Sequence, residues 1–221
     1  MKKNNLILGT FLAITAILFS SCAGGPTNVT DIDGNVYNVV SIGNQCWMKE
    51  NLKVTHYKNG DVIPQVQDKQ AWAKLTTGAW CYYNNDASNG TKYSKLYNWY
   101  AVHDPRGLAP NGYHIPTDEE WKKLTDYLGE ESEAGTKMKS TSGWYNNGNG
   151  TNSSGFSGLP GGYRGDDGTF NYIGNYGYWW SSTDYNTYNA WFRSLNYFNG
   201  NVYRYVYFGK ENGFSVRCLR D

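Results

Sequence analysis

The stretch Gly112-Tyr-His-Ile-Pro-Thr-Asp-Glu-Glu-Trp121 carries a complete start signal for a helix. Thr117 is the expected N-cap residue, and Glu120 completes a capping box in which each side chain bonds the other residue's backbone N–H. Gly129 fits the left-handed conformation with which many helices end. The apolar stripe between these signals repeats at spacings of three and four and consists of Trp121, Leu124 and Leu128. The pattern predicts a helix with one buried face.

Downstream of this helix, the sequence predicts three consecutive strands: Tyr188 to Leu195, Val202 to Phe208 and Phe214 to Leu219. In the second strand, Tyr203, Tyr205 and Tyr207 share one face. In the third, Phe214, Val216 and Cys218 alternate on an apolar face that we expect in the core. The chain contains 20 Tyr, 9 Trp and 26 Gly, a composition that favours short strands and turns over a helical bundle.

Upstream, Val36 to Ile42 reads as a strand and Ser94 to His103 as a short helix. The segment Asp31-x-Asp33-Gly-Asn35 reads as a turn, because the further oxygen ligands and the closing Glu of a calcium loop are missing.

The stretch from Gly143 to Gly177 is too long for an ordinary connection. Its many aromatic residues indicate an ordered, self-packed loop, with a tight turn at Asp166-Asp-Gly168.

The first 21 residues read as a lipoprotein signal peptide, with Lys2 and Lys3 before an apolar run and Ser20-Ser21 before Cys22. We expect cleavage before Cys22, acylation of its thiol, and a tether that ends near Thr30. This places the protein in the outer membrane, facing either the periplasm or the outside, with the membrane as a partner through the lipid. Secretion with an unmodified Cys22 and an uncleaved anchor are the alternatives.

Charge and cysteine spacing exclude several classes of function. The formal net charge is +1, and the charges are scattered, so no electrostatic footprint for nucleic acid is present. No Cys-x-x-Cys and no Cys/His cluster occurs, which argues against a zinc site. We therefore expect no metal and no cofactor.

Several motifs together resemble the Fibrobacter succinogenes major paralogous domain, a family common in surface lipoproteins. They are Ile42-Gly-Asn-Gln-x-Trp-Met-Lys-Glu-Asn-Leu52, Leu96-Tyr-Asn-Trp99, Gly112 to Trp121, Trp180-Ser-Ser-Thr183 and Ser215-Val-Arg-Cys218. The resemblance covers residues 31–221 as one domain. More distantly, the chain is similar to formylglycine-generating enzymes and C-type lectin-like domains. That similarity implies an α+β fold: a twisted, mainly antiparallel sheet, two helices and long irregular loops, with the terminal strand beside Val36–Ile42.

The resemblance also implies a disulfide. Cys81 and Cys218 both lie in family-like segments, so we expect a bridge between them. Cys46 is the rival partner, because it follows the first strand.

Two classes of function remain open. An enzyme of the formylglycine-generating type is disfavoured because no Cys lies between Tyr163 and Phe214, and Gly155-Phe-Ser-Gly158 lacks the final Gly of a serine-hydrolase elbow. The acidic residues after Thr117 are explained by capping, and His114 reads as a structural residue. A carboxylate pair acting on polysaccharide stays open as the enzymatic alternative.

A binding or adhesion module for a glycan or a surface protein fits more of the sequence. We place its working face on the loop side between Tyr163 and Trp191, where tyrosine rings can stack on sugars and polar side chains can bond hydroxyl groups. The candidate binding residues are Tyr163, Arg164, Asp166, Asp167, Tyr185 and Tyr188.

Overall fold

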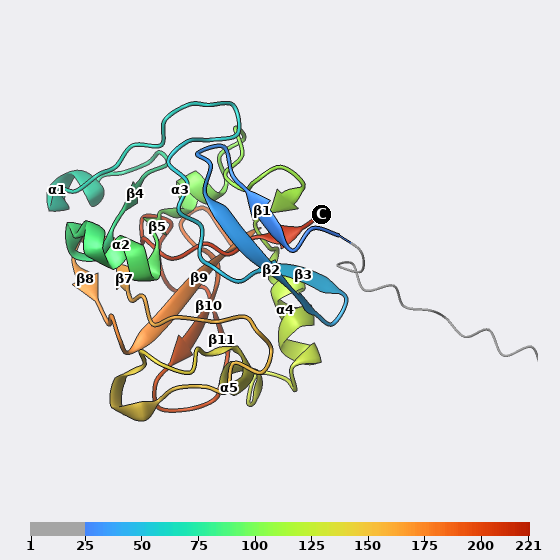
Figure 1. The fold of residues 1–221 in the computed structure, drawn as a ribbon. Helices are drawn as coiled ribbons and strands as arrows, with labels where there is room; N and C mark the ends of the chain where they lie inside the picture. Colours follow the sequence, from blue (N-terminus) through green and yellow to red (C-terminus); the bar gives the residue numbers. More distant parts are fainter. Residues whose placement is uncertain (1–24) are drawn as a thin grey trace, which may run out of the picture.

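Residues 25–221 are described by the computed structural model (Figure 1), and they form a mixed α and β fold with short helices and curled antiparallel sheets. Leader residues 1–21 and Cys22 lie outside the described residues. Within residues 25–221, no helix has the length and apolar composition needed to cross a bilayer.

A five-stranded sheet joins both ends of the described chain, in the order β1-β2-β3-β12-β6. Its strands are β1 (Asn28–Thr30), β2 (Val36–Ile42), β3 (Gln45–Met48), β6 (Tyr113–His114) and β12 (Leu219–Arg220). β12 pairs with β3 and β6, so the expectation that it lies beside β2 is wrong by one strand. The reason is local: Gly43, with a φ of 61°, turns β2 directly into β3, while β1 occupies the other edge of β2.

A second sheet, in the order β11-β10-β9, is built from the aromatic C-terminal part. Its strands are β9 (Tyr176–Asp184), β10 (Ala190–Asn196) and β11 (Tyr203–Tyr205). The predicted third strand is only partly regular: Phe214 and Ser215 make isolated bridges to Tyr97 and Trp179. The predicted alternation is nevertheless confirmed, because Phe214, Val216 and Cys218 are all buried. Two small two-stranded sheets complete the strands: β4 (Trp80–Cys81) with β5 (Leu96–Tyr97), and β7 (Tyr163–Arg164) with β8 (Phe170–Asn171).

The longest described helix confirms the prediction of a helix that begins after Thr117. α4 (Asp118–Tyr127) has the full capping box between Thr117 and Glu120, and Gly129 follows it with a φ of 101°. Trp121 lies in an aromatic core with Trp47 and Trp179, which fixes α4 between the two larger sheets. The other helices are α1 (Lys69–Trp72), α2 (Ala87–Tyr93), α3 (Trp99–Val102), α5 (Ala134–Met138), η1 (Tyr83–Asn85) and η2 (Tyr145–Asn147).

The predicted helix from Ser94 to His103 is mostly wrong. Only Trp99–Val102 is helical, and Leu96–Tyr97 forms β5 instead. Ser94 has a φ of 71°, a left-handed conformation that interrupts a helix. The apolar spacing that suggested a helix is satisfied by burial of Leu96, Tyr97 and Trp99 from an irregular backbone.

The expected disulfide is also wrong. Cys81 and Cys218 are free, buried thiols. They lie in different core clusters, Cys81 with Trp72 and Leu96, and Cys218 with the large aromatic cluster around Phe214. Because Cys218 is free, the rival pairing with Cys46 is not formed either.

Candidate functional site: an exposed tyrosine surface

The six residues predicted as the working face do not come together as one surface. Tyr163 is buried and packs on Tyr178, Phe208 and Phe214. Arg164 is fully buried. Neither side chain is therefore available to a large ligand, and both assignments need correction.

Arg164 holds two loops together. Its guanidinium donates hydrogen bonds to the carbonyl oxygens of Val66, Gln67, Asp68 and Gly168, at 2.6 to 3.2 Å. The ring of Trp72 lies 4.4 Å from the guanidinium carbon. These contacts fix the segment before α1 against the β7–β8 hairpin, which is a structural role.

Asp166 and Asp167 are exposed and build the predicted tight turn. Asp167 accepts hydrogen bonds from the backbone N–H and hydroxyl group of Thr169. Those bonds hold the pKa of the Asp167 carboxyl below its usual range. Tyr185 and Tyr188 are exposed at the turn between β9 and β10, where Tyr185 contacts Trp191.

The structure instead gathers other tyrosines on the β9–β11 sheet. We call this group the tyrosine surface: Tyr172, Tyr176, Tyr203, Tyr205 and Tyr207. Tyr172 and Tyr207 expose 53% and 60% of their surface, and Phe198, which is 58% exposed, borders the group beside Tyr176. Tyr176, Tyr203 and Tyr205 are half-buried. A partly exposed, contiguous set of aromatic rings marks an interaction surface more often than isolated rings do.

The rings of the tyrosine surface stand in two short rows. Tyr172 and Tyr176 have ring centroids 5.2 Å apart. Tyr203 and Tyr205 stack at 5.4 Å with an interplanar angle of 13°, and Tyr207 follows Tyr205 at 4.8 Å. Alternation within β11 places Tyr203 and Tyr205 on one face. Tyr207, two residues beyond the strand, continues the row through its contact with Tyr205.

Buried rings flank the tyrosine surface. Phe192 is the cross-strand neighbour of Tyr205 and lies 5.9 Å from its ring and 5.6 Å from that of Tyr207, and Tyr176 stacks with Tyr178 at 5.8 Å. Phe192 and Tyr178 belong to the large core cluster, as does Tyr163. Because these flanking rings are packed, the exposed rings lose little further conformational freedom when a ligand binds.

The hydroxyl groups of Tyr176, Tyr205 and Tyr207 are uncharged at neutral pH. Burial raises the pKa of Tyr207 to about 12, with Tyr205 and other tyrosines adding to the effect. Burial and neighbouring tyrosines also raise the pKa of Tyr176 and Tyr205. Each phenol can therefore both donate and accept a hydrogen bond, and Asn199 already donates one to Tyr203, at 2.7 Å.

Two of the three acidic residues at the start of α4, Asp118 and Glu120, make structural contacts. Glu120 accepts from Thr117 and lies 3.0 Å from His114 Nε2, while His114 Nδ1 lies 2.7 Å from Asp221. Asp118 pairs with Arg193 and Arg204.

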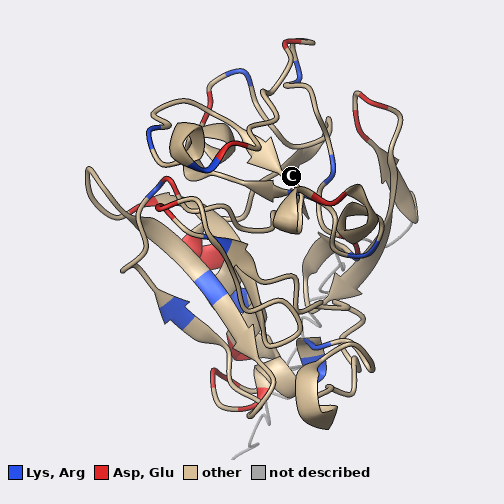
Figure 2. Cartoon of the chain, turned by 90° about the vertical axis from the view of Figure 1, so that its left-hand side faces the viewer, with Lys and Arg blue, Asp and Glu red and all other residues tan. Residues whose placement is uncertain are grey.

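Residues 25–221 contain no group of three or more His, Cys, Asp or Glu side chains that could hold a metal ion. On the side shown in Figure 2, basic and acidic segments alternate rather than gathering by sign.

The sequence matches the Fibrobacter succinogenes major domain over residues 40–220. The chain belongs to this family. No curated protein and no solved structure matches it. The family motifs that the sequence displays build the scaffold: the domain's Gly112–Trp121 stretch forms β6 and the start of α4, and its Ser215–Cys218 stretch crosses the core.

The tyrosine surface of this family member lies outside those motifs. Sequence reasoning placed Tyr203, Tyr205 and Tyr207 on one strand face but gave them no role. Three tyrosines at alternate positions were the signal that could have found the site. Their proximity to Tyr172 and Tyr176 depends on the pairing of β9, β10 and β11, which the sequence pattern does not contain.

Proposed function

We propose that this chain is a non-catalytic glycan-binding module of a bacterial envelope, held to the outer membrane by a lipid on Cys22. The observation that carries the binding role is the tyrosine surface: partly exposed rings beside a packed core, each with a phenolic hydroxyl group. The apolar C–H faces of pyranose rings stack on aromatic rings, and sugar hydroxyls bond to phenols, so a glycan matches this chemistry.

The same proposal includes the lectin-like form of the α+β fold. It is supported by the first and last strands of the described chain, which meet in one antiparallel sheet. The lipid anchor rests on the leader sequence, and globomycin treatment tests it. Accumulation of an unprocessed precursor supports acylation, whereas a mature protein with an unmodified Cys22 contradicts it.

Binding is tested with a matched pair of triple variants on a glycan array, followed by calorimetry on the best ligand. In the first variant, Tyr172, Tyr203 and Tyr207 are replaced with Ala. The control replaces Tyr127, Tyr185 and Tyr188, which are 66%, 54% and 75% exposed but lie outside the tyrosine surface. We expect the first variant to bind about tenfold more weakly or worse, because buried aromatic contacts dominate binding energy, and the control to bind like the wild type.

The control also tests the face predicted from sequence, since it removes Tyr185 and Tyr188. Loss of binding only in the control would move the site to the β9–β10 turn. Equal binding by all three proteins would exclude both surfaces. Turnover of the bound glycan would contradict the non-catalytic role.

A further inference from the structure

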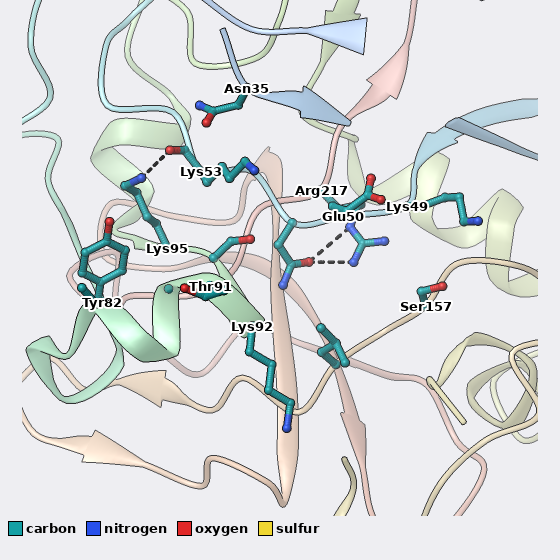
Figure 3. Close-up of a pocket in the computed structure, with 15 residues that line it drawn as sticks. Asn35, Lys49, Glu50, Lys53, Tyr82, Thr91, Lys92, Lys95, Ser157 and Arg217 are labelled. Atoms are coloured by element: carbon teal, nitrogen blue, oxygen red, sulfur yellow. Dashed lines mark hydrogen bonds between the residues drawn. The ribbon is translucent and has the colours of Figure 1, made fainter. Parts of the chain in front are cut away.

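A groove of about 670 Å³ lies on another part of the molecule. It is lined by the segment that follows β3, by α2, and by the loop around Ser157 (Figure 3). None of the residues of the tyrosine surface lines it.

The lining of this groove is strongly cationic. It contains five basic side chains and one acidic one: Lys49, Lys53, Lys92, Lys95, Arg217 and Glu50. The Glu50 carboxylate is engaged by Asn38, which donates from its backbone N–H and its side-chain amide, both at 2.8 Å. Among the described residues, none of the five cations forms an ion pair. The groove thus concentrates positive charge on a chain whose formal net charge is only +1.

The floor of the groove is rigid. Arg217 is fully buried and donates to Asn51 Oδ1 at 2.7 Å and to the carbonyl oxygens of Met48 and Phe156 at 3.1 and 2.6 Å. Burial lowers the pKa of Arg217 to about 9, which reflects a cation held without a carboxylate partner. Lys95 donates to the carbonyl of Lys53 and lies over the ring of Trp80 at 4.7 Å.

Three ammonium groups around this floor are free to bind. In the described structure, the side-chain amines of Lys49, Lys53 and Lys92 donate no hydrogen bond; Lys53 and Lys92 only approach the rings of Tyr37 and Tyr93. Lys49 and Lys53 come from the segment after β3, and Lys92 comes from α2 (Figure 3). Cations on opposite sides of a groove favour an anion between them.

We propose that this groove is a second binding site, which takes an acidic saccharide through its carboxylate or sulfate groups. Its volume suits a short oligosaccharide rather than a single small ion. Neutral hydrogen-bonding groups, including Asn35, Thr91 and Ser157, also line it and match sugar hydroxyls. A flat bilayer would not reach a recessed floor, and a nucleic acid would need a longer basic track than one groove provides.

The test compares the full chain, purified in a non-ionic detergent, with two triple variants of equal charge. One carries Lys49→Gln, Lys53→Gln and Lys92→Gln. The matched control carries Lys69→Gln, Lys74→Gln and Lys123→Gln, three exposed lysines outside the groove. The probes are trigalacturonate, a sulfated chondroitin disaccharide, and fully methyl-esterified trigalacturonate, which keeps the sugar shape without the charge.

We expect calorimetry to show binding of at least one acidic probe, weakened about tenfold or more in the groove variant and unchanged in the control. Raising the salt concentration should weaken wild-type binding, and the methyl ester should not bind. Binding of neither acidic probe, equal loss in both variants, or equal binding of the methyl ester would each overturn the proposal. Groove-dependent binding to phosphatidylglycerol vesicles without saccharide binding would assign the groove to lipid headgroups instead. Because the tyrosine surface is intact in both variants, failure here leaves the proposed function standing.

Discussion

At the scale of single residues, Arg164 shows how a buried cation can be accommodated without a carboxylate. It has no exposed surface, and its three guanidinium nitrogens all donate to backbone carbonyl oxygens. A buried charge is costly unless hydrogen bonds compensate it. In return, the carbonyl oxygens of Val66, Gln67 and Asp68 obtain a charged donor, which for Asp68 adds to the bond from the Trp72 backbone N–H.

The first prediction concerns this residue. Replacing Arg164 with Met keeps much of the side-chain volume but removes the hydrogen bonds to four carbonyl oxygens. We expect the free energy of unfolding to fall by about 3 kcal/mol or more, measured by urea denaturation with tryptophan fluorescence. Asp166→Ala, two residues away on the exposed turn, is the control and should change it by less than about 0.5 kcal/mol. Equal effects of the two changes would show that Arg164 has no special structural role.

The same residue shows where sequence reasoning stops. An Arg between a tyrosine and a Gly-Asp-Asp turn is typical of an exposed loop tip, and that pattern led to its assignment as a binding residue. Its burial depends on the chain from Val66 to Asp68, which is about a hundred positions distant in the sequence. No local pattern carries such a contact.

At the scale of elements, His114 connects three of them. It sits in β6, it contacts Glu120 in the first turn of α4, and it contacts Asp221 after β12. Hydrogen bonding to Glu120 raises the pKa of His114 against the effect of burial, with Asp221 adding to it. Burial alone would raise the pKa of Glu120, but bonds from His114 and Thr117 hold it at about 2.

The second prediction follows from the direction of that shift. Because the pKa of His114 is higher in the folded protein than its ordinary 6.5, its charged form stabilises the fold. This contribution is complete below pH 6.5 and is lost as the pH rises through the folded pKa. We expect His114→Gln to lower the melting temperature at about pH 6 and to lower it less at about pH 9, because the imidazole loses its charge as the pH rises. The effect at pH 6 should be only a few degrees, because solvent screens this partly exposed site.

Asp221→Asn provides the comparison for this pH dependence. It removes one of the two carboxylates around His114, so it should reduce the difference between the two pH values without removing it. A His114→Gln effect that is the same at both pH values would contradict an ionic role for the imidazole.

Elements whose signals are local were predicted well. The capping box at Thr117 and the glycine after α4 involve residues close in sequence, and both are present. The predicted helix from Ser94 failed because Leu96 and Tyr97 pair with β4 and with Phe214, so tertiary contacts replaced helical ones. Only part of the tyrosine surface could be predicted, for the same reason. Tyr203, Tyr205 and Tyr207 alternate within one short segment, whereas Tyr172 and Tyr176 come from a different segment.

At the scale of the whole molecule, the core clusters are joined through shared strands. Trp179 and Trp180 are neighbours in β9, yet they belong to different clusters. In β4, Trp80 lies in the large cluster and Cys81 lies in the small one beside Trp72. Successive residues of one strand point to opposite faces, so a single strand packs against two clusters at once. We therefore expect the loss of packing in one cluster to disturb the other.

The third prediction uses the two free thiols as reporters of this coupling. Burial raises the pKa of Cys81 and of Cys218 to about 12, so neither thiol should react with iodoacetamide in the folded protein near neutral pH. Cys81 reports on the small cluster and Cys218 on the large one. We expect both to become alkylated over the same range of urea concentration in which tryptophan emission shifts to the red, with peptide mass spectrometry resolving the two sites. Alkylation of Cys81 at a distinctly lower urea concentration would show that the region around α1 and β4 unfolds separately, despite the strands that it shares with the main core.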